Sequence, residues 1–143
     1  VMVILHDAYF YWCHRLLHTK RVWNIHGVHH QATDPTIVTS HVFHYIETFI
    51  NYTFIVWFTL LAGLVAGGVF FIPVIAFVIF TTVWNIYGHG KKNLLPDNVT
   101  KSWIGRGIVW PSYHLEHHRQ GTGNFEFFLT YWDKICGTRV KDN

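Results

Sequence analysis

A long stretch without charge is the feature that most constrains this chain. Residues 48–88 are 41 consecutive positions without Asp, Glu, Lys, Arg or His. A helix that crosses a bilayer needs about 20 apolar residues, so this stretch is long enough for two crossings. Gly67 and Gly68 lie near its middle and favour a tight turn. The pattern predicts a transmembrane hairpin at about residues 48–89, with helices over 48–65 and 69–89, and the alternative is a buried hairpin of a soluble protein.

Composition supports the membrane interpretation. Charged residues make up 13% of the chain, about half the share found in a soluble domain. The net charge of +3, without a dense basic run, does not favour nucleic acid as a partner. At 143 residues the chain is expected to be a single domain over 1–143. It opens on an apolar segment without an initiator Met, which predicts that upstream transmembrane segments are missing.

The basic residues predict which side of the membrane carries the rest of the chain. All 11 Lys and Arg residues lie outside the hairpin, at 15–21 and 91–141. A two-helix hairpin returns the chain to the side that it left, and basic flanks favour the cytoplasm. We therefore expect a multi-pass protein of the endoplasmic reticulum or, in a bacterium, of the inner membrane.

Eight of the twelve histidines fall into three tight groups on that same side. Spacings of three and four residues place side chains on one face of a helix, and neutral imidazole is the commonest protein metal ligand. Eight ligands exceed the four of a tetrahedral zinc, which predicts two metals, or one metal with bystander histidines. Imidazole suits iron, zinc, copper or nickel, so the metal stays open. The three groups are His14 and His18; His26, His29 and His30; and His114, His117 and His118.

The fold class that follows is all-α: an integral-membrane helical bundle with a transmembrane hairpin and a cytoplasmic histidine-rich cap. Residues 1–19 and 22–31 are expected to be helical, and 91–111 irregular. Ser112 is the expected N-cap of the helix that carries the third group. The aromatic residues of 125–134 suggest a segment docked on the surface, and His6 and His41 are expected to be core residues.

Four motifs, in this order, resemble the fatty acid hydroxylase / sterol desaturase superfamily. They are D-A-Y-F-Y-W-C-H-R-L-L-H at 7–18, H-G-V-H-H at 26–30, H-L-E-H-H at 114–118 and W-D-K-I-C-G-T at 132–138. The resemblance covers nearly the whole chain. It implies a membrane-bound non-haem di-iron enzyme that uses O2 and two electrons to hydroxylate or desaturate a lipid.

The resemblance also implies a larger site. It adds His89, at the cytoplasmic end of the helix before the last motif, to the eight grouped histidines as a ninth metal ligand. Some relatives carry a further histidine where this chain has Asn85, which is expected to bind weakly through water or to orient a ligand. Asp7 is expected to hold a ligand imidazole. His44, in a His-x-x-Glu element with Glu47, is expected to support the site or the fold.

The resemblance implies two iron ions as cofactor and O2 as co-substrate, with zinc possible in purified protein. No flavin or haem motif is visible, so the electrons are expected from an external donor of the cytochrome b5 or ferredoxin type. The lipid, whether sterol, fatty-acyl or related, stays open, because one fold serves many substrates. The alternative is a non-catalytic or degenerate membrane protein with a structural zinc-type histidine site. A metal-dependent hydrolase or lyase ranks lower, since no nucleophile accompanies the motifs.

Overall fold

The computed structural model describes residues 1–140, and these are helical apart from loops and one isolated β-bridge between Ile108 and Leu129. The predicted all-α fold is therefore confirmed. The short 3-10 turns are η1 (His29–Gln31), η2 (Thr39–His41) and η3 (Gly105–Gly107). The α-helices are α1 (Met2–Leu17), α2 (Trp23–His26), α3 (Tyr45–Ala66), α4 (Phe71–Gly88), α5 (Asp97–Thr100), α6 (Pro111–Gln120) and α7 (Tyr131–Ile135).

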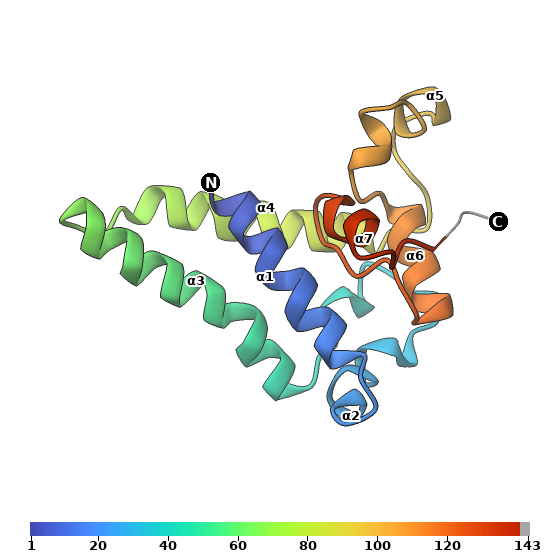
Figure 1. Cartoon of the computed structure of the whole chain (residues 1–143), viewed down its shortest axis with the longest axis horizontal. Coiled ribbons are helices and arrows are strands. Elements are labelled where there is room, and N and C mark those ends of the chain that lie inside the picture. The colour runs from blue at the N-terminus through green and yellow to red at the C-terminus, as the bar shows by residue number, and fades with distance from the viewer. Residues whose placement is uncertain (141–143) are drawn as a thin grey trace.

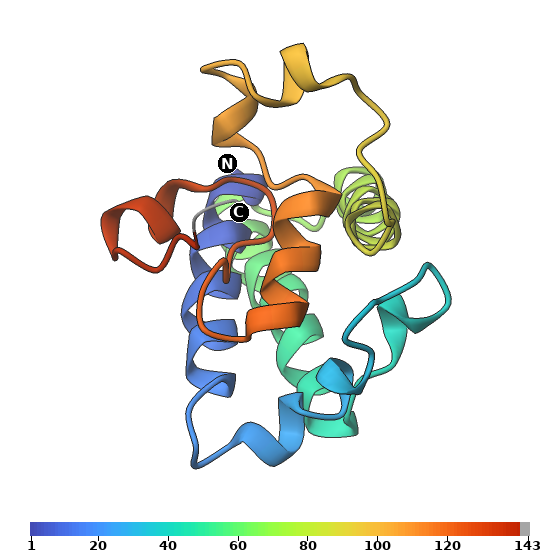
Figure 2. The same ribbon diagram turned by 90° about the vertical axis from the view of Figure 1, so that its right-hand side faces the viewer.

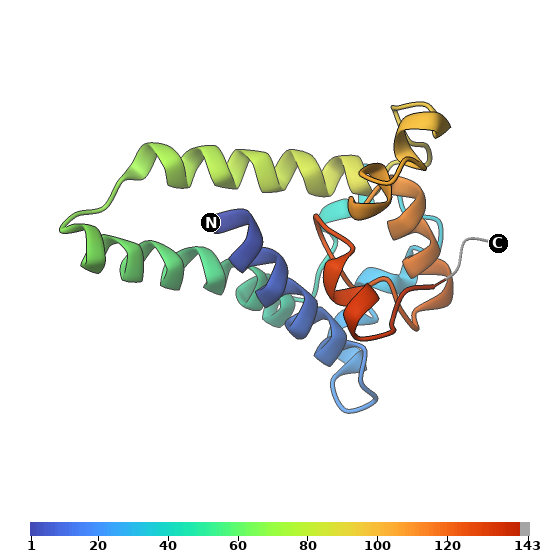
Figure 3. The same ribbon diagram turned by 45° about the horizontal axis from the view of Figure 1, so that its top comes forward.

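Helices α3 and α4 form a long hairpin that projects from the rest of the molecule (Figures 1 and 3). Gly67 ends α3 with φ 73°, a left-handed conformation that glycine adopts without steric cost. Both helices are long and apolar enough to cross a membrane, with a mean hydropathy of 1.8 each. Only 6% of either apolar window is buried inside the structure. A core hairpin of a soluble protein would be mostly buried, so these surfaces need another apolar cover.

Helix α3 begins at Tyr45, three residues before the predicted start. His44 provides the reason, because its Nδ1 accepts a hydrogen bond from the backbone N–H of Ile46 at 3.2 Å. The side chain thereby satisfies an amide that the first helical turn leaves free. His44 is a helix cap in this structure.

Helix α1 packs against α3 near the base of the hairpin (Figure 3). The hydroxyl of Tyr9 donates a hydrogen bond to the carbonyl of Ile50 at 2.8 Å, which ties the two helices together. His6 lies buried among aromatic rings, including those of Phe54 and Phe77. His6 is thus a core residue as predicted, whereas His41 is exposed, and the expectation of a buried His41 is wrong.

Residues 125–130 are mostly buried rather than docked on the surface, which corrects that part of the prediction for 125–134, whereas Tyr131 and Lys134 of α7 are exposed. Phe125 and Phe128 are only 5% and 3% exposed. The carboxylate of Asp133 accepts hydrogen bonds from the backbone N–H groups of Phe125 and Glu126, both at 3.1 Å. Glu126 in turn accepts from the backbone N–H groups of Trp132 and Asp133. This reciprocal carboxylate clasp folds the loop back onto α7 without a sheet or a disulfide.

Helix α6 begins at Pro111 and not after Ser112, so the predicted N-cap is wrong. Proline suits the first helical position, where its missing N–H is not needed. The carbonyl oxygen of the Asn93 side chain instead accepts from the backbone N–H of Ser112 at 3.1 Å. A residue distant in sequence thus caps the helix that carries the third histidine group. The segment with α5 and η3 forms a lobe to one side of α6 (Figure 2).

Candidate metal centre

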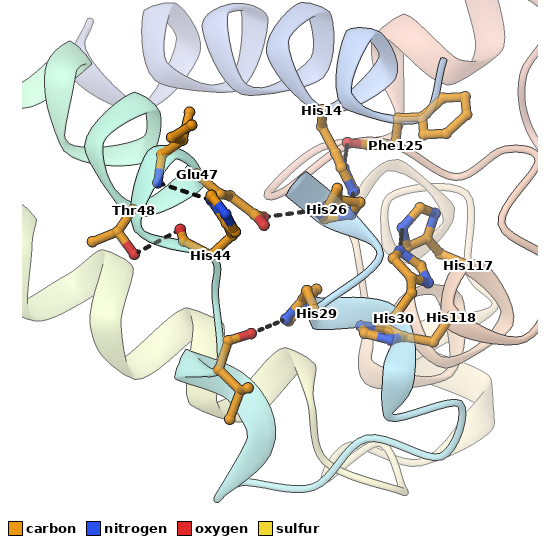
Figure 4. Close-up of polar contacts among 12 residues, drawn as sticks. His14, His26, His29, His30, His44, Glu47, Thr48, His117, His118 and Phe125 are labelled. Atoms are coloured by element: carbon orange, nitrogen blue, oxygen red, sulfur yellow. Dashed lines mark hydrogen bonds and ion pairs between the residues drawn. The ribbon is translucent and has the colours of Figure 1, made fainter. Parts of the chain in front are cut away.

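Nine histidines from α1, α2, η1, α6 and the end of α4 come together in two clusters, and Figure 4 labels His14, His26, His29, His30, His117 and His118 among them. They divide into two clusters, and within each cluster the possible ligand nitrogens all lie within 4.8 Å of one another. Eight of the nine residues are buried, and His18 is half-buried. The five-histidine cluster comprises His14, His18, His26, His30 and His117. The four-histidine cluster comprises His29, His89, His114 and His118.

Each cluster takes residues from several sequence groups, and helical geometry explains the division. His14 and His18 are four residues apart on α1 and face one cluster together. On α6, His114 and His118 are likewise four apart and share a face. His117 stands about 100° around the helix from His118 and enters the other cluster. Adjacent histidines in one motif therefore serve different positions.

Backbone carbonyls fix the tautomer of five of these rings. A carbonyl oxygen can only accept, so a histidine Nδ1 bonded to it carries the proton, and the neutral ring keeps a lone pair on Nε2. The Nδ1–carbonyl pairs are His14–Phe125 at 2.8 Å, His29–Val42 at 3.2 Å, His89–Asn85 at 2.7 Å, His117–Gly123 at 2.7 Å and His118–Ala32 at 3.1 Å.

The inward-facing nitrogens of each cluster are placed to hold a cation. The Nε2 atoms of His29 and His89 lie 3.1 Å apart, although both rings have already placed their proton on Nδ1. Two bare lone pairs at that distance repel each other. In the five-histidine cluster, the Nε2 atoms of His14 and His26 are 2.9 Å apart, and the buried Nε2 of His18 has no hydrogen-bond partner in the described part of the chain. An ion between the nitrogens of each cluster would satisfy all of them.

The separations between nitrogens suit a transition metal. Metal–imidazole bonds of about 2.0–2.1 Å place neighbouring ligands roughly 3.0 Å apart in octahedral and roughly 3.4 Å apart in tetrahedral geometry. Five of the Nε2–Nε2 distances within the two clusters run from 2.9 to 3.2 Å, and all the possible ligand atoms of each cluster lie within 4.8 Å of one another. The residues present therefore fit two metal ions, one for each cluster.

Burial keeps the imidazoles neutral, which is the form that binds a metal. Loss of hydration lowers the pKa of His30 and of His89 to about 4, and that of His18 and of His118 to about 3. Repulsion from neighbouring rings adds to the effect. The pKa is also lowered, first by burial and then by neighbouring histidines, for His14, His26, His29, His114 and His117.

A cavity of about 90 Å³ connects the two clusters with the base of the hairpin. His14 and His26 of one cluster and His29 and His89 of the other line it, so both clusters face the same space. The remaining wall is formed by side chains of α1, α3, α4, the segment from η2 to α3 and the C-terminal loop, among them Phe10, His41, Phe43, Thr48, Asn51, Ile55, Thr82 and Phe127.

The three residues predicted to support the ligands occupy different places. Asn85 lines the cavity and holds His89 through its backbone carbonyl, while its side-chain amide donates to the carbonyl of Ser40 at 2.7 Å. His44 caps α3. Asp7 accepts from the backbone N–H groups of Phe128 and Leu129 at 2.7 and 3.2 Å. The prediction that Asp7 holds a ligand imidazole is thus corrected, since its carboxylate anchors the C-terminal loop.

Sequence reasoning missed the carbonyl groups that orient the histidines and undervalued Glu47. Backbone carbonyls leave no trace in a sequence, because every residue carries one. Glu47 is 2% exposed and accepts a hydrogen bond from Nδ1 of His26 at 2.7 Å (Figure 4). The signal in the sequence that identifies Glu47 is its place as a lone acidic residue at the edge of a charge-free stretch, because a buried carboxylate there needs a partner.

Comparison with known proteins assigns the family. The model of the family described as Fatty acid hydroxylase matches residues 1–138. This chain therefore belongs to the fatty acid hydroxylase family, as the motifs predicted. It is 32% identical to methylsterol monooxygenase 1 of Rattus norvegicus over 142 residues, covering 96% of the chain and 45% of that protein. It is 25% identical to the very-long-chain aldehyde decarbonylase GL1-4 of Oryza sativa subsp. indica, covering 94% of the chain and 22% of that protein.

The chain spans less than half the length of these curated relatives. A further relative, methylsterol monooxygenase 1 of Gallus gallus, is 28% identical over 148 residues, which cover 43% of its length. No solved structure matches the chain. The family is thus established by sequence, whereas the geometry of the two clusters comes from this structure alone.

Proposed function

We propose that this chain forms the metal-holding part of an O2-dependent, non-haem di-iron oxidoreductase that hydroxylates or desaturates a C–H bond of a lipid. The observation that carries the proposal is the pair of histidine clusters on one cavity at the base of an apolar hairpin. Relatives named as a monooxygenase of methylsterols and a decarbonylase of very-long-chain aldehydes support an apolar substrate.

The nine histidines are the proposed ligands, and iron bound there would supply the activation of O2 with two electrons. Hydroxylation then consumes one C–H bond, O2, two electrons and two protons, and yields an alcohol and one water. Desaturation removes two hydrogens from neighbouring carbons with the same oxidant and electrons, and yields an alkene and two waters. Both balances require an outside reductant, and an electron donor of the cytochrome b5 or ferredoxin type fits.

The chain itself contributes position and exclusion of water. Carbonyls hold Nδ1 of His14, His29 and His89, so their Nε2 lone pairs point inward. Phe10 and Phe127 line the cavity and keep its wall apolar. A dry, preorganised site strengthens electrostatic interactions and protects a strong oxidant from side reactions.

The proposal places α3 and α4 across the bilayer, with the clusters on the cytoplasmic side. The outward faces of both helices are apolar and exposed, as a lipid environment requires. The basic segments before and after the hairpin lie on the side of the clusters, which matches the positive-inside tendency. Labelling of single cysteines introduced at exposed Lys92 and Lys101, from either side of sealed vesicles, tests this orientation.

The decisive experiment measures metal content and reductant-dependent O2 uptake of the full-length protein in detergent. We expect two iron ions per chain, O2 uptake that needs an electron donor, and an oxidised lipid among extracted products. One zinc ion per chain without O2 uptake would support a structural site instead and overturn the oxidoreductase. His41→Ala is the matched control for metal loading, because His41 belongs to neither cluster.

A further inference from the structure

The two histidine clusters differ in what lies behind their ligands. His29, His89 and His118 of the four-histidine cluster donate Nδ1–H to neutral backbone carbonyls. In the five-histidine cluster, His26 is instead bonded to the carboxylate of Glu47, with both side chains 3% exposed. Within residues 1–140, this is the one ion-pair contact between an acidic side chain and a clustered histidine.

Glu47 is held so that its carboxyl group is directed at His26, and a cation bound by His26 would favour the charged carboxylate. Glu47 lies in the first turn of α3, where the helix dipole favours a negative charge. Its Oε1 lies 2.7 Å from Nδ1 of His26, and its buried Oε2 has no hydrogen-bond partner among residues 1–140. No second donor shares the carboxylate, so its electrostatic effect falls on a single imidazole.

A carboxylate behind a ligand imidazole acts differently from a carbonyl. It makes the ring a stronger electron donor, and loss of such a partner typically costs 10–100-fold in metal affinity. His26 reaches the ion through Nε2, which lies 2.9 Å from Nε2 of His14. The five-histidine position thus combines one more ligand with a negative charge directly behind one of its rings.

We propose that Glu47 is a positioning residue that makes the two metal positions unequal, so that the five-histidine cluster holds its ion more tightly. The proposal rests on the two-metal centre of the proposed function but not on the reaction. It predicts sequential release, in which the ion of the four-histidine cluster leaves first.

Graded chelation of the full-length protein loaded with Co2+ tests the inference. We expect two release steps from the unaltered protein and, in Glu47→Gln, a shift of the tighter step by 10–100-fold towards weaker binding. Glutamine keeps an oxygen that can accept from His26 and removes the charge. Asp7→Asn is the matched control, because Asp7 is a buried carboxylate bonded to backbone N–H groups of the C-terminal loop. We expect its two release steps to be unchanged.

A second pair of variants isolates the position that Glu47 serves. His29→Ala removes a ligand of the four-histidine cluster, so the remaining ion belongs to the five-histidine cluster. Adding Glu47→Gln to His29→Ala should then weaken that ion by the same 10–100-fold, whereas adding it to His117→Ala should leave the remaining ion unchanged. Equal shifts in both backgrounds, or none in either, would overturn the inference. Mössbauer spectra of 57Fe-loaded protein should show one of two doublets altered in Glu47→Gln.

These outcomes stay separate from the proposed reaction. A protein that binds two metals unequally but consumes no O2 would defeat the oxidoreductase and keep the role of Glu47. An active di-iron enzyme whose two ions leave together, with and without Glu47→Gln, would support the oxidoreductase and defeat the role of Glu47.

Discussion

The hairpin and the histidine-rich cap are stabilised by opposite means. Side chains on α3 and α4 face outward, and Leu64 and Ile72 are more than four-fifths exposed. The cap instead buries polar groups, including Asp133 at 0% and His117 at 0% exposure. The hairpin needs only an apolar surrounding, whereas each cap residue depends on a specific partner. Substitutions should therefore be tolerated on the exposed face of the hairpin and damaging in the cap.

The largest effect is expected for a metal ligand of the cap. His29→Ala removes one of the four ligand nitrogens of its cluster, so we expect that cluster to lose its ion. Activity should fall by more than about 100-fold, because losing a ligand costs more than losing a residue that only supports a ligand. Metal analysis and O2 uptake measure this. Near-full activity with two metals in His29→Ala would refute the assigned site, and His41→Ala should load two metals.

Acidification should weaken the cap and leave the hairpin intact. Burial lowers the pKa of His30 and of His89 from 6.5 to about 4, so the unfolded chain takes up protons first as the pH falls. The contribution that these two neutral imidazoles make to the free energy of unfolding is complete above pH 6.5 and is lost between pH 6.5 and 4. It is on the order of 3 kcal/mol for each group. Thermal unfolding of the metal-free protein checks the sign, and greater stability at pH 4.5 than at pH 7.5 would contradict it.

The carboxylate clasp should matter through stability rather than chemistry. Asp133 accepts from the backbone N–H groups of Phe125 and Glu126 and from the hydroxyls of Tyr113 and Thr138. Asp133→Ala leaves these buried donors unpaired, at about 1–3 kcal/mol each for an unsatisfied group. We expect a clearly lower Tm, with loss of metal on mild heating.

Asp97→Asn is the matched control for the clasp. Its carboxylate pairs with Lys101, but the side chains are 74% and 69% exposed. Exposed ion pairs contribute little, so the Tm should stay close to that of the unaltered protein. A drop in Tm as large as that of Asp133→Ala would show that the clasp has no special role.

The parts that could be predicted from the sequence are those that depend on periodicity and solvent. The absence of charge over 48–88 predicted the hairpin, the motif spacing predicted eight of the nine histidines that gather, and the family resemblance added His89. The division into two clusters could not be predicted, because it depends on how α1, α2 and α6 cross. The partners of Asp7 and Glu47 were equally hidden, since both are buried carboxylates and only tertiary packing decides which one meets a ring.

A smaller effect is expected at the cavity edge, where cap and hairpin meet. The side-chain amide of Asn85 donates to the carbonyl of Ser40, and its backbone carbonyl, which any residue supplies, holds His89. Asn85→Ala should therefore keep both metals and lower activity several-fold, through a loosened cavity wall. Steady-state rates together with metal content decide this, and an unchanged rate would make Asn85 purely structural.

The smallest effect is expected on the outer face of the hairpin. Leu64 lies near the turn of the hairpin and is 81% exposed, so Leu64→Ala removes no internal contact of consequence. Exposed substitutions of this kind usually change stability by less than about 0.5 kcal/mol.

Phe77→Ala is the counterpart of Leu64→Ala on the same hairpin, because Phe77 is 6% exposed and packs against His6. A buried aromatic truncated to alanine costs about 3–5 kcal/mol. Equal Tm values for Leu64→Ala and Phe77→Ala would mean that burial inside the chain does not decide which positions tolerate substitution. The difference between the hairpin and the cap would then need another cause.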